Sequence, residues 1–420
     1  MPKSKIFLAT VITFFSYTFF QCVSLPSQIL SFLSPFRYQL LEKSWLLTDS
    51  SPSWQAISYS LLNSLSWWIF LLSLMMYFMI LHVHLSSHRR IKTVILIMLV
   101  VGTLEALYGI IQALVPSVGV LWINSSYTGC ARGTFICRNH FAGFLEMVLP
   151  LGLGFAMLYG DWYTGNSHQK SGNKRILKKM ISSDQLHKQI FLSLIIGIML
   201  LALVFSKSRA GIAGAIAGLV TFTLIVRSAN KSLPIFFWII AGAVLGLLFI
   251  YGSKMGFDPV IKRFLELREG ISRLGLWQDG MVILKDHPLG IGLGNFKQIS
   301  PVYVTSGLSE VTVFSHAHND YLQLLIETGW PGFLAIVSGF FIFIGISIGK
   351  AVKLKPFDHP LDFFIAAGAI SSLVSMAFHS FFDFNLQIPA NCVYFVTLIT
   401  LVYAVLWGKR PHRGTVYKYD

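Results

Sequence analysis

Residues 314–333 hold the densest group of side chains that could take part in chemistry. The segment reads FSHAHNDYLQLLIETGWPGF and carries His316, His318, Asn319, Asp320 and Glu327. An imidazole titrates near neutral pH, so His318 could act as a general base that removes a proton from an attacking hydroxyl group. In the alternative reading, Asn319 or Asp320 caps a helix and the histidines are only solvated.

A metal centre is not expected in this chain. His316 and His318 form an H-x-H pair, but no clear third ligand is present and the sequence contains no HExxH motif. The glycine-rich stretch GIGLGN at 290–295 follows no predicted strand, so we interpret it as a flexible outer loop rather than a phosphate-binding loop. No organic cofactor is indicated either.

Arginines form the second group of candidates. They lie in the segments CARGTFICRNH, SKSRAG and GISRLGLW, as Arg132, Arg138, Arg209 and Arg273. Arginines near apolar depth need anionic partners, and the chain has only 18 acidic residues against 33 basic ones. If these guanidinium groups meet in one outer cavity, they would bind a diphosphate and neutralise the charge on a leaving group. Alternatively, each one reaches out to lipid headgroups.

Transmembrane helices must position these residues. The chain is 54% hydrophobic and 12% charged, about half the charged fraction of a soluble protein. Apolar stretches of about 20 residues predict ten spans, near 6–25, 61–85, 93–115, 139–159, 190–206, 211–226, 234–252, 322–348, 361–380 and 386–406. We therefore expect an all-α polytopic transmembrane bundle, one integral membrane domain over 1–420. Stretches 26–60 and 275–286 have room for further helices, giving 10 to 12 spans.

The distribution of Lys and Arg predicts the orientation. Basic residues concentrate in the segments between alternate spans, which puts both termini in the cytoplasm and 253–321 outside as a long loop. Within that loop, an amphipathic helix on the membrane surface is indicated by the helical spacing of Leu274, Trp277, Met281 and Leu284. The net charge of +15 is explained by membrane lipid, so nucleic acid is not an expected partner.

Two of the four cysteines share the predicted outer segment GCARGTFICRNH. An oxidising compartment would let Cys130 and Cys137 form a disulfide, although their spacing does not decide whether they do.

Together these segments resemble the O-antigen ligase and polysaccharide polymerase superfamily of bacterial inner membranes. The similarity is greatest in SRLGLWQDGMVILKDHPLGIGLGNF and HAHNDYLQLLIETGWPGF, and extends to RGTFICRNHFAGFL, FSKSRAGIAG and HSFFDFNLQIPAN, so it covers about 130–390. The ligase motif of the family is a His, a small polar residue, nine positions, a Gly, two positions and a further Gly. His318, Asn319, Gly329 and Gly332 fit that spacing.

The resemblance implies a helical membrane glycosyltransferase of the C type that uses an undecaprenyl-diphosphate-linked glycan as donor. It also implies that 253–321 is a long periplasmic loop. His318 would be the catalytic histidine, with Arg209 and Arg273 holding the donor diphosphate and no metal required. Arg138 and His140 match a family segment with a less defined role. His316 and Asn319 would support His318, and Asp383 with His379 could line the same cavity.

The acceptor is left open by the sequence. It could be a lipid A-core sugar, as for a ligase, another lipid-linked repeat, as for a polymerase, or a protein side chain, as for an O-oligosaccharyltransferase. The segment DFNLQIPAN is similar to exopolysaccharide polymerases and favours that class. A polytopic transporter or lipid flippase is the alternative from another class, although the internal repeats common in transporters are not evident.

Overall fold

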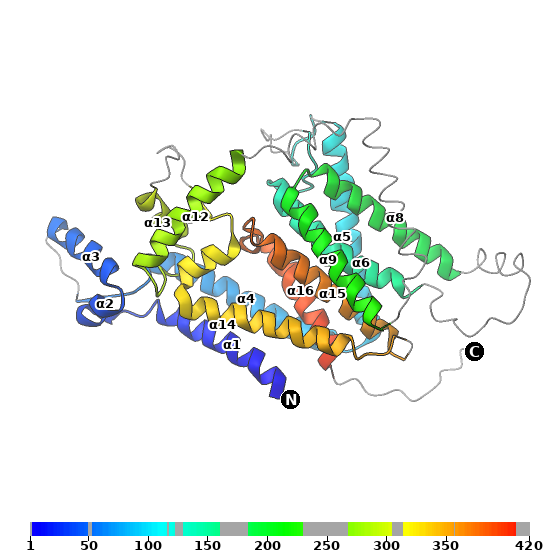
Figure 1. Ribbon diagram of the computed structural model, residues 1–420, viewed down its shortest axis with the longest axis horizontal. Helices are drawn as coiled ribbons and strands as arrows, with labels where there is room; N and C mark the ends of the chain where they lie inside the picture. Colours follow the sequence, from blue (N-terminus) through cyan, green and yellow to red (C-terminus); the bar gives the residue numbers. More distant parts are fainter. Residues whose placement is uncertain are drawn as a thin grey trace, which may run out of the picture. The chain divides into compact units, whose positions relative to one another are not determined.

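The computed structural model describes residues 2–48, 53–115, 117–121, 129–159, 184–229, 268–304, 314–356 and 358–408. Helices dominate this part of the chain (Figure 1). The one sheet in it is a two-stranded antiparallel pair, β1 (Leu25–Pro26) and β2 (Trp54–Gln55), with Leu25 opposite Gln55.

Eight helices in the described residues are long and apolar enough to cross a bilayer, judged by length and composition. They are α4 (Leu61–His84), α5 (His88–Leu114), α6 (Arg138–Met157), α8 (Asp184–Phe205), α9 (Arg209–Ala229), α14 (Asp320–Ala351), α15 (Pro360–His379) and α16 (Pro389–Trp407). They correspond to eight of the ten predicted spans and are consistent with a polytopic helical membrane protein. The predicted span 6–25 overlaps α1 (Pro2–Phe20), which ends five residues earlier. The predicted span 234–252 lies outside the described residues.

The chain divides into two compact units. The first comprises Met1–Met76, Asp258–Ile346 and Ala377–Cys392, and the second comprises Tyr77–Phe257, Ser347–Met376 and Val393–Asp420. His318 and Arg273 belong to the first unit, whereas Arg138 and Arg209 belong to the second.

The stretches 26–60 and 275–286, where the sequence has room for further helices, contain α2 (Ser27–Leu33), α3 (Pro35–Thr48) and the C-terminal part of α12 (Arg268–Asp286). The first unit also has α13 (Phe296–Ile299) and the 3₁₀ helices η2 (Ser300–Tyr303) and η3 (Asn385–Gln387), which lie outside those stretches. The predicted apolar stripe of α12 divides between two environments. Leu284 is buried and Trp277 packs against the core of the unit, whereas Leu274 and Met281 are exposed.

Helix α14 is kinked, and the kink fixes the glycine-rich stretch 290–295. Gly329 has a positive φ of 62°, and Pro331 has no N–H to offer the carbonyl of Glu327 four residues earlier. That carbonyl accepts from the N–H of Gly292 (2.9 Å) instead, and the neighbouring Ile326 carbonyl accepts from Ile291 N–H (3.1 Å). The prediction of a flexible loop is therefore wrong, because its backbone replaces the hydrogen bonds that the kink removes.

Small residues bring the helices of the second unit close together. Helix α6 is buried along almost its whole length and packs against α5, α8 and α9. A Cβ added at Gly218 of α9 would lie 3.0 Å from the carbonyl oxygen of Ser371 on α15. Such close approach of backbones is how membrane helices gain packing energy in lipid.

Candidate active site at the start of α14

The first turn of α14 is bonded to the turn between α15 and α16. The backbone N–H of Asp320 donates to the carbonyl of Ser380 (2.8 Å). The carboxylate of Asp320 accepts from the Ser380 hydroxyl (2.9 Å) and from the N–H of Leu386 (3.0 Å). Because Asp320 is only 6% exposed, these bonds are shielded from water and hold two segments about 60 residues apart in one arrangement.

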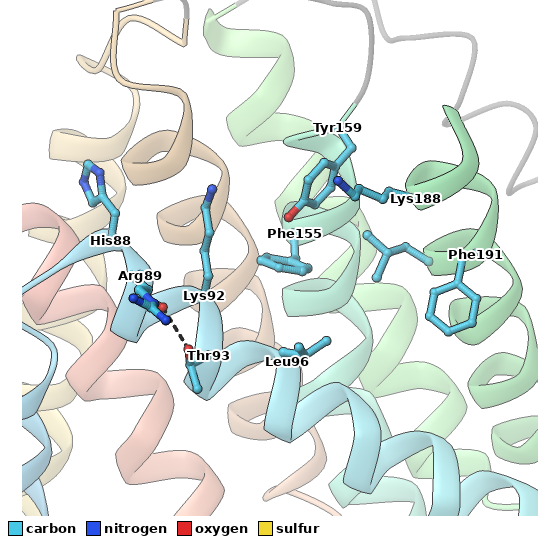
Figure 2. A pocket seen from close by; sticks show the side chains of 10 residues that line it. His88, Arg89, Lys92, Thr93, Leu96, Phe155, Tyr159, Lys188 and Phe191 are labelled. Atoms are coloured by element: carbon cyan, nitrogen blue, oxygen red, sulfur yellow. Dashed lines mark hydrogen bonds between the residues drawn. The ribbon is translucent and has the colours of Figure 1, made fainter. Parts of the chain in front are cut away.

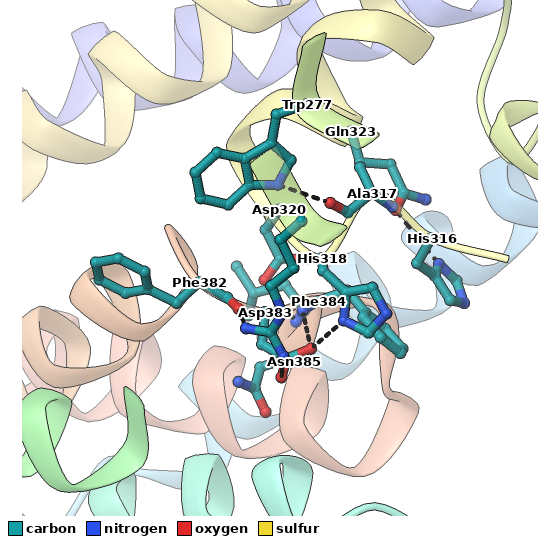
Figure 3. Close-up of polar contacts among 12 residues, drawn as sticks. Trp277, His316, Ala317, His318, Asp320, Gln323, Phe382, Asp383, Phe384 and Asn385 are labelled. Carbon is teal, nitrogen blue, oxygen red and sulfur yellow. Dashed lines mark hydrogen bonds and ion pairs between the residues drawn. The ribbon is translucent and has the colours of Figure 1, made fainter. Parts of the chain in front are cut away.

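That arrangement places His318 against Asp383. The distance from Nδ1 of His318 to Oδ1 of Asp383 is 3.2 Å (Figure 3). The His318 side chain is 30% exposed and that of Asp383 is 1% exposed. His318 has a positive φ of 49°, a conformation that only about a few per cent of non-glycine residues adopt. Such outliers persist where the surroundings enforce them, and they cluster at functional sites.

The charge of Asp383 determines which nitrogen of His318 carries the proton. Burial alone would raise the pKa of Asp383, but the hydrogen bond from His318 and the charges of His318, Arg273 and His379 outweigh it and hold that pKa below its usual range. Asp383 is therefore a carboxylate and can only accept hydrogen bonds. Nδ1 of His318 must be the donor, and in the neutral ring this leaves the lone pair on Nε2.

Arg273 of α12 also contacts Asp383. Its Nη2 lies 3.7 Å from Oδ2 of Asp383, and its Nη1 donates to the carbonyl of Phe382. The argument from composition expected the outer arginines to lack acidic partners, and for Arg273 that expectation is wrong. A single buried carboxylate instead orients both the histidine and the arginine.

Asn319 and His316 flank His318 and have different surroundings. The Asn319 side chain accepts from Leu322 N–H (3.0 Å), so it caps α14, as one of the two sequence readings expected. His316 stacks on Phe384 with ring centroids 4.2 Å apart, and burial is the main cause that lowers its pKa. Phe384 also makes a T-shaped contact with the His318 ring, with centroids 4.8 Å apart. The helix cap and the His318–Asp383 pair therefore coexist.

A chain of polar contacts links this site to the ordered glycine loop. Gln323 accepts from the N–H of Ala317 (3.2 Å) and donates to Oε1 of Glu327 (3.1 Å). Oε2 of Glu327 accepts from Gly294 N–H (2.9 Å). Trp277 of α12 donates its indole N–H to the carbonyl of Ala317 (3.0 Å; Figure 3). The backbone at Ala317, between His316 and His318, is therefore held by hydrogen bonds to Gln323 and to Trp277.

In the second unit, Arg138 and Arg209 begin two neighbouring helices. Arg138 is the first residue of α6 and Arg209 the first of α9, and a Cβ added at Gly211 would collide with Ala142. Ser208 caps α9 by accepting from the N–H of Gly211 (3.2 Å). The two arginines thus accompany adjacent helix N-termini, where exposed N–H groups and the helix dipole favour an anion. His140 is buried in the first turn of α6.

The segment between α5 and α6 is tied to the helices around it. Glu105 accepts from the N–H of Thr134 (2.8 Å) and from its hydroxyl, and Ala131 N–H donates to the carbonyl of Phe205 (2.9 Å). Cys130 is buried and Cys137 half-buried, and no disulfide joins them in the structure. Within the described ranges, no group of three or more His, Cys, Asp or Glu side chains could hold a metal ion.

Comparison with known proteins identifies part of the chain. Residues 194–337 match a family model described as O-Antigen ligase. This match supports membership of the O-antigen ligase superfamily. The O-antigen ligase match includes Arg209, Arg273 and His318, and ends before Asp383. It indicates a glycosyltransferase-like enzyme that acts on glycan and lipid-linked substrates. No curated protein matched the chain.

Asp383 is the residue whose role sequence reasoning did not find. The sequence placed it in a family segment and suggested only that it could line the cavity. It is 65 residues from His318, so no spacing rule connects the two. One feature of the sequence could have indicated its role: the segment DFN separates two apolar runs and places an acidic side chain just after the end of a predicted span.

Proposed function

We propose that the protein transfers or polymerises a glycan carried on undecaprenyl diphosphate, at the periplasmic face of the bacterial inner membrane and without a metal ion. The observation that carries the proposal is the His318–Asp383 pair: a partly exposed imidazole whose Nδ1 is held by a buried carboxylate. This is the arrangement of a general base and its orienting acid.

His318 removes the proton from the acceptor hydroxyl. Nε2 accepts this proton while the acceptor oxygen attacks the anomeric carbon, and the bond from that carbon to the diphosphate oxygen breaks. Asp383 stabilises the imidazolium that forms. A displacement from the opposite face inverts the anomeric configuration. A positioned general base typically contributes a factor of about 10² to 10⁴ to the rate.

Arginines neutralise the departing diphosphate. Arg273 uses two of its nitrogens on Asp383 and Phe382 and keeps further N–H donors for phosphate oxygens. By resemblance to the family, we also assign Arg209 and Arg138 to the donor diphosphate, with His140 in support. His316 and Asn319 support His318 by packing on Phe384 and by capping α14. Guanidinium groups bind phosphate oxygens in pairs, which suits a leaving group that gains charge.

The acceptor class distinguishes the variants of this function. A second lipid-linked repeat makes the protein a polymerase, which we favour. A lipid A-core sugar makes it a ligase, and a serine or threonine makes it a protein O-oligosaccharyltransferase. A transporter or lipid flippase remains the alternative from another class, and it would not need a base at position 318.

A reconstituted transfer assay tests the proposal. Purified protein is mixed with lipid-linked glycan and acceptor in the presence of EDTA, and both extended glycan and free lipid diphosphate are quantified. We expect activity in the wild type, a loss of about 10² to 10⁴ in His318→Ala, and no loss in His84→Ala, which removes an exposed histidine of α4. Equal rates in His318→Ala and wild type would overturn the proposal.

A further inference from the structure

A cavity of about 520 Å³ opens in the second unit, at the end where α5 and α8 begin and α6 ends (Figure 2). Its wall comes from these three helices, which pack against one another. It contains none of the residues assigned above to the transferase site.

Along both α5 and α8, which begin at this end, basic side chains come first and apolar side chains follow. On α5, Arg89 and Lys92 precede Leu96 on one face, and on α8, Lys188 precedes Phe191 and Leu192. At about 1.5 Å of rise per residue, each apolar side chain lies roughly 5 to 10 Å deeper than the basic one before it. Two helices therefore offer cations at the rim and hydrocarbon surface further in.

The apolar surface is accessible from outside the unit. Leu96 is 47% exposed and Phe191 is 60% exposed, whereas Leu192 and Phe155 behind them are buried. Figure 2 shows Lys92 and Lys188 on either side of Phe155, with Leu96 further along α5. A water-soluble anion would contact the lysines but would leave the apolar wall uncovered.

The lining of the cavity combines basic and apolar side chains. Among the described residues, no Asp or Glu belongs to it. His88 at its edge lies 3.5 Å from Asp362, so that histidine has an acidic neighbour of its own and is not counted as a ligand. The basic side chains at the rim are Arg89, Lys92 and Lys188, all exposed.

We propose that this cavity binds one anionic glycerophospholipid, with its headgroup phosphate at Arg89, Lys92 and Lys188 and an acyl chain along Leu96 and Phe191. The distribution of basic residues predicts that this end faces the cytoplasm, where the leaflet carries anionic lipid. The proposal does not rest on the transferase function, since it concerns other residues.

Native mass spectrometry of the full-length protein tests the site. The protein is titrated in a neutral detergent with phosphatidylglycerol or with phosphatidylcholine of the same acyl chains. The test variant is Lys92→Gln with Lys188→Gln. The matched control is Lys353→Gln with Lys355→Gln, which removes the same charge from two exposed lysines outside the cavity.

We expect the wild type to hold one phosphatidylglycerol more tightly than phosphatidylcholine. The test variant should bind phosphatidylglycerol roughly 10- to 30-fold more weakly, the fold-change for about 1 kcal/mol per basic side chain near the lipid surface. Phosphatidylcholine binding and the control variant should be unchanged. If the control variant loses as much affinity for phosphatidylglycerol as the test variant does, the attraction comes from the overall charge and the proposal fails.

Two further arms separate a lipid site from a phosphate site. Phe191→Ala, which truncates an exposed side chain, should weaken both lipids several-fold while leaving the melting temperature within about 2 °C. Glycerol 3-phosphate at millimolar concentration should not displace bound phosphatidylglycerol. If it does so, or if Phe191→Ala binds both lipids as the wild type does, the apolar wall takes no part and the lipid proposal is overturned.

Discussion

Asp383→Asn tests whether the buried carboxylate makes His318 a base. The structure puts the His318 and Asp383 side-chain atoms 3.2 Å apart. Two unit charges at that distance attract by about 5 kcal/mol at an effective dielectric constant of about 20. In Asp383→Asn, the imidazolium that forms on His318 during proton transfer loses this attraction. An asparagine can also donate its amide N–H to Nδ1, which would move the ring proton to Nε2 and remove the lone pair.

The expected result is a fall of about 10³ to 10⁴ in the transfer rate per folded enzyme. The rate is measured with purified protein and lipid-linked glycan, and melting temperatures are recorded in parallel because the substitution also removes the acidic partner of Arg273. Asp362→Asn, the same chemical change beside His88 in the second unit, is the control and should keep the wild-type rate. A rate within threefold of wild type in folded Asp383→Asn would refute the reasoning.

Three further predictions follow from the same structure. Arg273→Gln should lower the transfer rate by about 10² to 10³, since a charge-stabilising donor is lost; an unchanged rate would remove Arg273 from the diphosphate site. Gly329→Ala should cost about 1 to 3 kcal/mol of unfolding free energy, because its φ is 62° and the new Cβ would lie 2.5 Å from the Pro288 carbonyl oxygen. A Cβ added at Gly345 would meet no described neighbouring atom within 4 Å, so Gly345→Ala should be neutral or stabilising. Equal melting temperatures for the Gly329→Ala and Gly345→Ala variants would contradict the account of the kink. Burial, partly offset by Asp286, lowers the pKa of His287 to about 4, whereas the unfolded chain binds that proton near pH 6.5. Stability should therefore fall as pH drops from about 6.5 to 4. His287→Gln should show a smaller difference in melting temperature between pH 7.5 and pH 5, and an unchanged difference would refute this.

The membrane helices could be predicted because the bilayer imposes their length. About 20 consecutive apolar residues are needed to cross it, so hydropathy found 61–85 and 361–380 where α4 and α15 span Leu61–His84 and Pro360–His379. The start of α8 was predicted six residues too late. Its first turns, DQLHKQ, are polar, and a search for apolar stretches cannot detect a helix that continues beyond the hydrocarbon.

The site could be predicted only in part, because its decisive contacts are between distant segments. His318 stood out by its chemistry and its neighbours along the chain. Its pairing with Asp383 depends on how Asp320 joins the turn between α15 and α16, and no local pattern encodes that. The stretch GIGLGN was interpreted as flexible for a similar reason. Its glycines satisfy a carbonyl that Pro331 leaves without a donor, on a helix more than 30 residues away.

Glycan products in a strain that lacks the native gene test the central claim most directly. The strain is complemented with wild type or with His318→Ala at matched membrane abundance, and lipid-linked donor and products are resolved by gel. The account predicts that His318→Ala loses product while undecaprenyl-linked glycan accumulates, as single repeats for a polymerase or as long chains for a ligase. Product at wild-type levels in His318→Ala would contradict the account and leave Asn319, His318 and Asp383 as a helix-capping arrangement.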